Sequence, residues 1–274
     1  GCCAPAALSA FGAAMAGLFM VTGMDSLASS SRSVLHGLCA QRPSHSYTIG
    51  GHLLPFDARM TGIYTGSLAT WMALAFRGRL LVSGTPPWQV IAALGAGVLA
   101  LALDGTNALL VDLAVWHPWE PYNATRLFTG FATGVALATL EVWLIGSSLW
   151  RLSSRIPVWT GLRELWWTVP AALGVFTLVR LDLGWSYPIM VAALLVSAWL
   201  TVTGLALVIV LSAFRLERRI GTIRQLEPPM VVAACLAIGI IIGLAQARFW
   251  LERTLGILQD FVASMITPLA SILR

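Results

Sequence analysis

The chain has 274 residues, of which 58% are hydrophobic and 11% are charged, and its mean hydropathy is +0.81. Because soluble domains carry roughly one-quarter charged residues, this composition excludes an ordinary soluble protein and indicates an integral membrane protein. The formal net charge is +5 and all 17 basic residues are arginines, but they are scattered at the ends of apolar runs and do not indicate a surface that binds nucleic acid.

Apolar runs of about 20 residues, long enough to cross a bilayer, recur along the chain. We therefore predict an all-α polytopic transmembrane bundle that forms a single integral membrane domain over residues 1–274, in the cell membrane of a bacterium or archaeon. The sequence predicts seven spans, at residues 4–24, 60–76, 88–111, 125–150, 165–181, 187–213 and 230–250. Pro170 and Pro188 interrupt the helical pattern of the fifth and sixth spans, so the sequence does not fix their edges.

The N-terminal residues favour an ordinary first span, because small and apolar residues continue too far for the apolar region of a signal peptide. A trimmed signal region and lipidation of Cys2 or Cys3 are the alternatives. The first residue is glycine, which leaves open that the true start lies upstream.

The C-terminal residues follow the last predicted span. Their apolar positions recur at helical spacing, at Leu251, Leu255, Leu258, Val262, Met265 and Ile266. This spacing predicts an amphipathic helix that lies in the membrane interface. Residues 150–274 therefore contain further spans and this helix.

The arginines between spans predict the orientation, because cytoplasmic loops retain positive charge. The connections after the second, fourth and sixth spans are rich in arginine, whereas those after the third and fifth contribute only Arg180. We therefore expect the N-terminus inside and the C-terminus outside. The polar segment Leu38–Gly66 would then lie outside, between the first two spans.

Three pairs of small residues lie four positions apart: Gly62/Gly66, Gly130/Gly134 and Gly239/Gly243. Such pairs allow two helix backbones to approach closely in lipid. They predict packing within the chain, with association between subunits as the alternative.

Several spaced blocks carry a resemblance to a known family. The matching positions are Cys39, Gln41, Ser46, Tyr47, Pro55, Ala58, Arg59, Thr61, Gly62, Ile63, Tyr64, Asp104, Gly105, Asn123, Arg126, Leu127, Thr129 and Gly130. Over about residues 36–136 the chain resembles the prokaryotic membrane family named domain of unknown function 2085. The resemblance implies a membrane protein and no particular activity. This chain departs from the family pattern at Ala40, where the family has histidine, and at Asp57 and Met60, where it has cysteines.

The first candidate site is a metal site in the polar segment. Its candidate ligands are Cys39, His52, Asp57 and His117, with His45 and Met60 as further members. Zinc or copper accepts such ligands when three or four converge at about 2.0–2.3 Å. No short ligand motif fixes that convergence, and ordinary polar contacts are the alternative. The missing family cysteines weaken a site built on thiols.

The second candidate site is a polar vestibule at the outer ends of the spans. Its members are Arg59, Asp104, Asn107, Asn123, Arg126, Arg180 and Asp182. An aspartate at membrane depth costs several kcal/mol unless it is paired, so Asp104 requires a partner that Arg59 or Arg126 would supply. A structural ion pair is one interpretation, and an outward cavity for a polar or anionic solute is the other. For Glu141, a hydrogen bond between helices is favoured over a proton relay.

The sequence favours a structural or accessory subunit of a larger membrane assembly over an enzyme. A transporter or channel for a small polar or anionic solute is the first alternative, and a membrane enzyme with a metal or thiol site is the second. The expected partners are membrane lipid and other membrane subunits. Bound lipid is expected, and the sequence requires no cofactor, since it contains no motif for nucleotide binding or acyl transfer.

Overall fold

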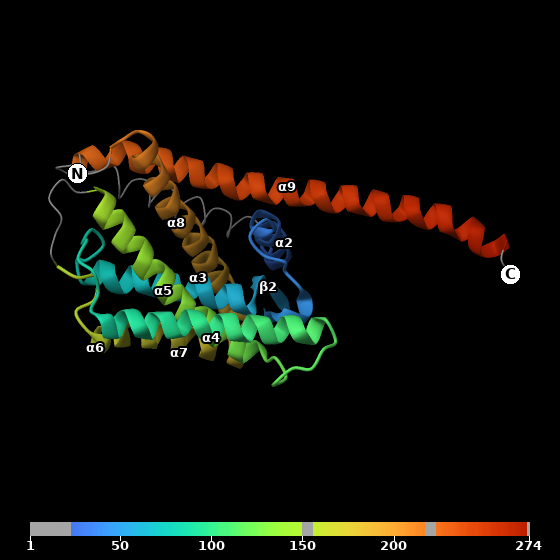
Figure 1. Ribbon diagram of the computed structural model, residues 1–274, viewed down its shortest axis with the longest axis horizontal. Helices are drawn as coiled ribbons and strands as arrows, with labels where there is room; N and C mark the ends of the chain where they lie inside the picture. Colours follow the sequence, from blue (N-terminus) through green and yellow to red (C-terminus); the bar gives the residue numbers. More distant parts are fainter. Residues whose placement is uncertain (1–22, 150–155, 217–222, 273–274) are drawn as a thin grey trace.

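The computed structural model describes residues 23–149, 156–216 and 223–272. The first predicted span, apart from its last two positions, lies outside this range together with Cys2 and Cys3. The elements are α2 (Met24–Leu35), η1 (Pro43–His45), β1 (Ser46–Ile49), β2 (His52–Asp57), α3 (Ala58–Phe76), α4 (Trp88–Asp112), α5 (Asn123–Leu149), α6 (Leu162–Leu165), η2 (Trp166–Thr168), α7 (Val169–Leu181), η3 (Gly184–Ser186), α8 (Tyr187–Ala213) and α9 (Ile223–Ile272). Figure 1 shows the long helices as a bundle from which α9 extends.

Within the described residues, 4 helical segments are long and apolar enough to cross a membrane: Trp88–Asp112, Asn123–Leu149, Gly184–Ala213 and Arg224–Ile257. They correspond to the third, fourth, sixth and seventh predicted spans, and the predicted count of seven is not confirmed. Helix α7 has 13 residues, so it covers roughly 20 Å of a hydrocarbon core of about 30 Å. Helix α3 has 19 residues and buries several small polar side chains against its neighbours.

Successive long helices alternate in direction. Helices α3 and α5 run parallel, because Gly62 lies against Leu127 and Gly66 lies against Phe131. Helix α4 runs opposite to them, since Asp104 meets Arg59 near the start of α3. Helix α8 follows the direction of α3, and α9 returns beside α8 (Figure 1). The polar residues near the starts of α3 and α5 therefore lie at one end of the bundle. The hairpin formed by β1 and β2 lies at the same end, which we call the hairpin end.

Direct backbone contact joins α3 to α5. A Cβ atom at Gly62 would lie 2.2 Å from the carbonyl oxygen of Leu127, and one at Gly134 would lie 2.0 Å from that of Ile63. Only glycine fits such a separation, as in other close helix pairs in lipid. The glycine pairs of these two helices therefore pack within the chain. At Gly239 and Gly243 of α9, by contrast, a Cβ atom would have no atom of the described chain within 4 Å.

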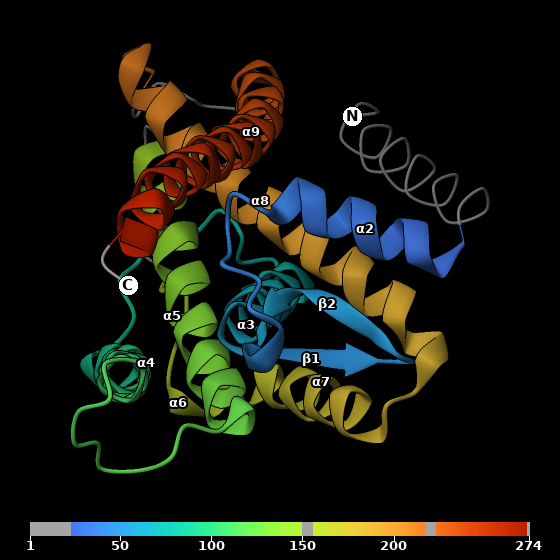
Figure 2. The same cartoon turned by 90° about the vertical axis from the view of Figure 1, so that its right-hand side faces the viewer.

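A β-hairpin forms much of the polar segment Leu38–Gly66. Strands β1 and β2 pair antiparallel, and Gly50 and Gly51 have φ values of 59° and 81°. Two consecutive residues with positive φ make the two-residue turn whose twist matches a hairpin. Figure 2 shows the hairpin beside α3, with α2 on one side and α7 on the other. Asp57 then ends β2 and caps α3, because its Oδ1 accepts a hydrogen bond of 2.8 Å from the Met60 N–H.

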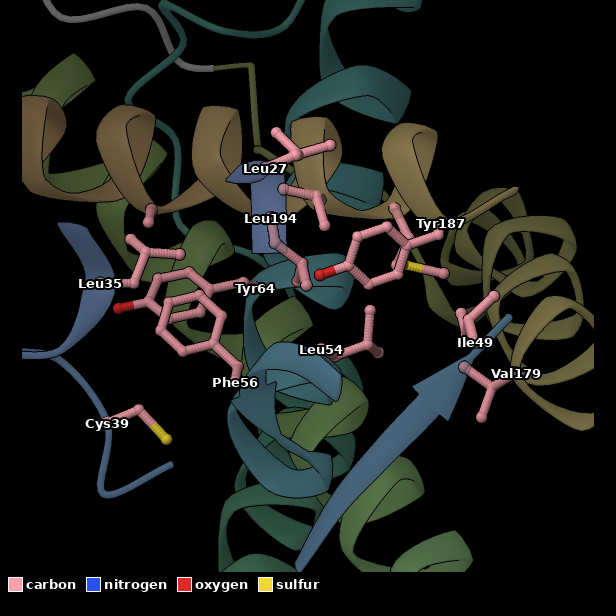
Figure 3. Packing of buried hydrophobic residues seen from close by; sticks show 13 residues of the cluster. Leu27, Leu35, Cys39, Ile49, Leu54, Phe56, Tyr64, Val179, Tyr187 and Leu194 are labelled. Atoms are coloured by element: carbon pink, nitrogen blue, oxygen red, sulfur yellow. The ribbon is translucent and has the colours of Figure 1, made fainter. Parts of the chain in front are cut away.

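The largest hydrophobic cluster lies at the hairpin end. It joins residues from α2, both strands, α3, α7 and α8, and includes Leu35, Cys39, Phe56, Tyr64 and Tyr187. In Figure 3 the rings of Phe56 and Tyr64 are stacked, with centroids 4.6 Å apart. The hairpin is therefore held to the helices by a packed apolar core, and it is not a loose loop.

Helix α9 is attached to the end of α2 by Arg248. Its Nη1 donates to the carbonyl oxygens of His36, at 2.8 Å, and of Cys39. Its Nε lies 2.8 Å from Glu252, which also pairs with His36 at 2.8 Å. The ring of Phe249 stacks on His36 with centroids 4.3 Å apart. The arginine thus satisfies the carbonyl of the C-cap residue His36 and that of Cys39 in the segment that follows α2.

A second ionic clamp lies at the opposite end of the bundle. Glu164 pairs with Arg77, and its Oε2 lies 2.6 Å from Nη1 of Arg79. The same carboxylate accepts a hydrogen bond of 2.7 Å from the Thr160 N–H. Burial raises the pKa of Glu164, but the hydrogen bonds from Thr160 and Arg79 outweigh burial and lower it. This clamp fixes the connection after α3 to the segment before α7.

Helix α9 continues without a break for 50 residues. The predicted last span and the predicted amphipathic helix are thus one helix, and the predicted position in the membrane interface is not confirmed. At 1.5 Å per residue α9 is about 75 Å long, more than twice the hydrocarbon thickness of about 30 Å. Figure 1 shows its C-terminal part extending away from the other helices.

Gly134→Ala is expected to lower the free energy of unfolding by about 1–3 kcal/mol, because the new methyl group would overlap the backbone of α3. Gly95→Ala on α4 is the matched control, since it has no described atom within 4 Å of its Cβ position. The control is expected to be neutral or to gain up to about 1 kcal/mol from helix propensity. Denaturation of both variants in the same detergent measures the difference, and equal stabilities would contradict the close contact.

Candidate functional site

The polar residues at the hairpin end form one cluster. Arg59 opens α3, while Asn123 and Arg126 open α5. Asp104 and Asn107 lie one turn apart near the end of α4, which runs the opposite way. We call these five residues the hairpin-end cluster. The antiparallel arrangement of α4 brings them together from three helices.

The strongest contact in the hairpin-end cluster is an ion pair. Nη2 of Arg59 lies 2.6 Å from Oδ2 of Asp104, and the two side chains are 28% and 2% exposed. The pair gives the aspartate a counter-charge, which a carboxylate at membrane depth needs. Oδ1 of Asp104 and Nε of Arg59 have no hydrogen-bond partner within the described chain. The structure therefore joins Asp104 to Arg59 and not to Arg126.

Arg126 is buried without an acidic partner among the residues that the structure describes. It is 6% exposed, and its Nη1 donates to Oδ1 of Asn123 at 2.9 Å. Its Nη2 lies 3.5 Å from Nε2 of His45. Burial and the charge of Arg126 lower the pKa of His45, so the imidazole is kept neutral and can accept this contact. With one carboxylate and two guanidinium groups, the hairpin-end cluster carries an excess positive charge.

The amide groups connect the hairpin-end cluster to nearby loops. Nδ2 of Asn107 donates to the carbonyl oxygen of Trp119 at 2.8 Å. Nδ2 of Asn123 lies 3.5 Å from the carbonyl oxygen of Ser44. Asn107 is 2% exposed, and its Oδ1 has no hydrogen-bond partner in the described part of the chain. These contacts fix the connection after α4 and the segment before β1 around the ion pair.

Arg180 and Asp182, the other two predicted vestibule residues, lie at the end of α7. Oδ1 of Asp182 accepts a hydrogen bond of 2.7 Å from the Gly50 N–H at the hairpin turn. Asp182 has a φ of 49°, which allows it to end α7. The Arg180 side chain is exposed, and its charge acts on Tyr47 of β1. Both residues therefore act on the hairpin, and these contacts do not join them to the ion pair.

The four principal metal candidates do not converge. Nδ1 of His52 lies 3.4 Å from Asp25, and Nε2 of His117 lies 3.1 Å from Glu120. Asp57 caps α3, while Cys39 is buried beside it. Within the described ranges no group of three or more His, Cys, Asp and Glu side chains is placed to hold a metal ion. The hairpin places His52 beside its turn and Asp57 at the start of α3, so the structure does not bring these candidates to one point, and the metal site stays a prediction.

Cys39 has a structural environment. Its sulfur lies 3.4 Å from the backbone N–H groups of Gln41 and Asp57, which donate to it. Burial, and then the charge of Asp57, raises the pKa of the Cys39 thiol to about 11. Since the thiolate is the nucleophile, a thiol held protonated in this way does not suit covalent chemistry near neutral pH.

Sequence reasoning missed the contacts of Arg248 with the end of α2. These side chains are distant in sequence, and α2 was not predicted. Its buried positions Leu27, Ser31 and Leu35 recur at helical spacing, which is the only signal that could have indicated the helix.

Comparison with known proteins supports the family resemblance. Residues 39–140 match the family model described as predicted membrane protein (DUF2085), which confirms the resemblance over that region. An uncharacterised protein of Methanocaldococcus jannaschii is 36% identical over 98 residues, which make up 35% of this chain and 56% of that protein. The chain thus spans about half the length of this curated relative. No solved structure matches the chain.

The matched region contains the whole hairpin-end cluster. It includes α3 and α4 and most of α5, whereas α7, α8 and α9 follow it. Together with the apolar helices, the match supports an integral membrane protein.

Asp104→Asn is expected to lower the free energy of unfolding by about 3 kcal/mol, because it leaves the Arg59 charge without its partner. This loss lies at the lower end of the range for breaking a buried ion pair, because the Arg59 side chain is 28% exposed. Asp112→Asn is the matched control, because the Arg42–Asp112 pair is 58% and 46% exposed and should contribute about 0–1 kcal/mol. Chemical denaturation in detergent measures both; equal losses would show that the buried pair contributes no more than the exposed one.

Proposed function

We propose that the protein is a structural or accessory subunit of a larger membrane assembly, with its N-terminus inside the cell and its C-terminus outside. The observation that carries this proposal is the open face of α9. Gly239 and Gly243 lie on this face, four residues apart, and neither meets an atom of the described chain within 4 Å of its Cβ position. Small residues at this spacing let another helix approach closely in lipid.

The apolar residues around the two glycines extend the same face. Val232 is 49% exposed and Leu236 is 41% exposed. Lipid can cover such side chains, but lipid gains nothing from a glycine groove, whereas a helix backbone does. The glycine pairs of α3 and α5 demonstrate this packing inside the chain. The partner that suits α9 is therefore another transmembrane helix with small residues at its contact.

The length of α9 also supports a partner outside the bilayer. The helix covers 50 residues, and its C-terminal part extends beyond the rest of the chain (Figure 1). An isolated helix gains most of its stability from packing along an apolar face. The apolar spacing from Leu251 to Ile266 supplies such a face. A neighbouring subunit would cover it at the hairpin end of the bundle.

The second candidate function is binding or transport of a small anionic solute at the hairpin-end cluster. It is favoured by the buried charge of Arg126, which has no acidic partner in the described ranges. A guanidinium group suits carboxylate and phosphate ligands. This candidate ranks second because Asn123 and His45 already occupy part of that guanidinium.

Native mass measurement after purification from the natural membrane in mild detergent tests the subunit proposal. We expect a defined complex with other membrane proteins, and we expect Gly243→Leu to reduce it. A loss of about 1.4 kcal/mol at the contact would reduce association about tenfold. Gly95→Leu on α4 is the matched control and should leave the complex intact. A wild-type protein that remains a lone monomer, or that associates only with its own copies, would contradict the proposal.

Reporter fusions test the proposed orientation. Alkaline phosphatase fused after Arg274 should be active, because this enzyme works only outside the cytoplasm. The matched fusion after Gly78, in the arginine-rich connection between α3 and α4, should be inactive. Activity at Gly78 and none at Arg274 would reverse the orientation.

A further inference from the structure

Glu141 is a buried carboxyl group that the proposed function does not use. It lies on α5, eight residues before the end of that helix at Leu149, or about 12 Å along the helix axis. Its exposure is 2%, and neither Oε1 nor Oε2 has a hydrogen-bond partner in the described part of the chain. Strict hydrogen-bond geometry is thus not reached, although donors from α3 and α8 approach the carboxyl group, at Trp71 and at the Leu205 N–H.

The surroundings of this carboxyl group come from α3 and α8. A Cβ atom at Gly204 would lie 2.0 Å from Oε1, so the carboxyl group rests directly on the backbone of α8. The indole of Trp71 and the backbone N–H of Leu205 approach it, and neither group carries a charge. Nε1 of Trp71 also has no hydrogen-bond partner among the described residues.

Ionisation of the Glu141 carboxyl group in this position would be energetically unfavourable. A charge in the membrane interior costs several kcal/mol unless it is paired, hydrated or bound to an ion. No basic side chain of the described chain lies within ion-pair distance of Glu141. A bound proton removes the charge and occupies no additional space.

A proton fits this position better than a metal cation does. Sodium and the larger cations need several oxygen ligands, whereas the approaching groups include the N–H groups of Trp71 and Leu205. An N–H group would point its positive end at a cation. It can instead donate to the carbonyl oxygen of an uncharged acid. The Thr201 hydroxyl, one helical turn before Leu205, is also buried without a partner in the described ranges and adds one polar group to this side of α8.

We propose that Glu141 is a proton-binding site within the membrane, at which an uncharged carboxylic acid packs against Gly204 of α8. Release of the proton would leave a negative charge on Glu141 against the uncharged backbone of α8 and would weaken the contact between α5 and α8. The ligand of the site is the hydrogen ion, supplied from the aqueous side nearer the end of α5. The proposal is independent of the subunit role and of the hairpin-end cluster.

Infrared spectroscopy of the whole protein in lipid tests this site at neutral pH. The carbonyl stretch of an uncharged carboxylic acid is separate from the stretches of a carboxylate. Labelling glutamate with carbon-13 at the side-chain carboxyl group distinguishes glutamate from aspartate. We expect one uncharged glutamic acid band in the wild-type protein, and we expect it to shift with the label and to disappear in Glu141→Gln. The control, Glu120→Gln, removes a glutamate whose side chain is 70% exposed and should retain the band.

Two additions keep the test decisive. Glu141→Asp keeps an acid at the position and should also remove the labelled glutamate band, which covers the case in which the glutamine variant does not fold. Replacing potassium by sodium in the buffer should leave the band unchanged. Absence of the band in the wild type, its survival in folded Glu141 variants, or its replacement by carboxylate bands in sodium would each overturn the proposal.

Discussion

Backbone contact between α3 and α5 is the constraint on which the rest of the fold depends. The glycines at positions 62, 66, 130 and 134 bring the two helices so close that no side chain fits between them. Both helices then begin at the same end of the bundle, and their first turns place Arg59 and Arg126 near each other. Two adjacent positive charges require compensation, and α4 supplies it because its direction places Asp104 at Arg59. A contact without charge thus determines where the charges meet.

The amino-acid sequence was a good guide wherever local pattern determines structure. Hydrophobic length identified α4, α5, α8 and residues 230–250 of α9, and the cost of burying Asp104 predicted an arginine partner. It could not determine which arginine pairs with Asp104, because that choice depends on how the three helices are staggered. The hairpin was missed although Gly50 and Gly51 mark its turn, since the residues around it also suit a polar loop. The sequence also could not predict that the glycine pairs of α3 and α5 contact a neighbouring helix of the described chain whereas Gly239 and Gly243 do not, because spacing alone does not say which helix has a neighbour.

Two of the three departures from the family pattern, Asp57 and Met60, lie at the start of α3, beside Cys39. Positions 39, 57 and 60, at which the resembling family has cysteines, lie together: the Asp57 N–H donates to the Cys39 sulfur, and Oδ1 of Asp57 accepts from the Met60 N–H. In this chain the aspartate caps the helix, while Met60 packs against the core that contains Cys39. The place where three thiols would meet is therefore occupied by a helix cap and apolar packing. The Cys39 thiol remains beside this cap and accepts the N–H groups of Gln41 and Asp57.

The contact between Arg248 and the end of α2 has a consequence for how the protein is made. The arginine and the Cys39 carbonyl that accepts from it are 209 positions apart in the sequence. During synthesis, α2, the hairpin and α3 leave the ribosome long before α9, so the Cys39 carbonyl lacks this donor until 209 further residues have been translated. The contacts of the His36 and Cys39 carbonyls with Arg248 can therefore form only after α9 has been made, so this part of the N-terminal region is completed late in synthesis.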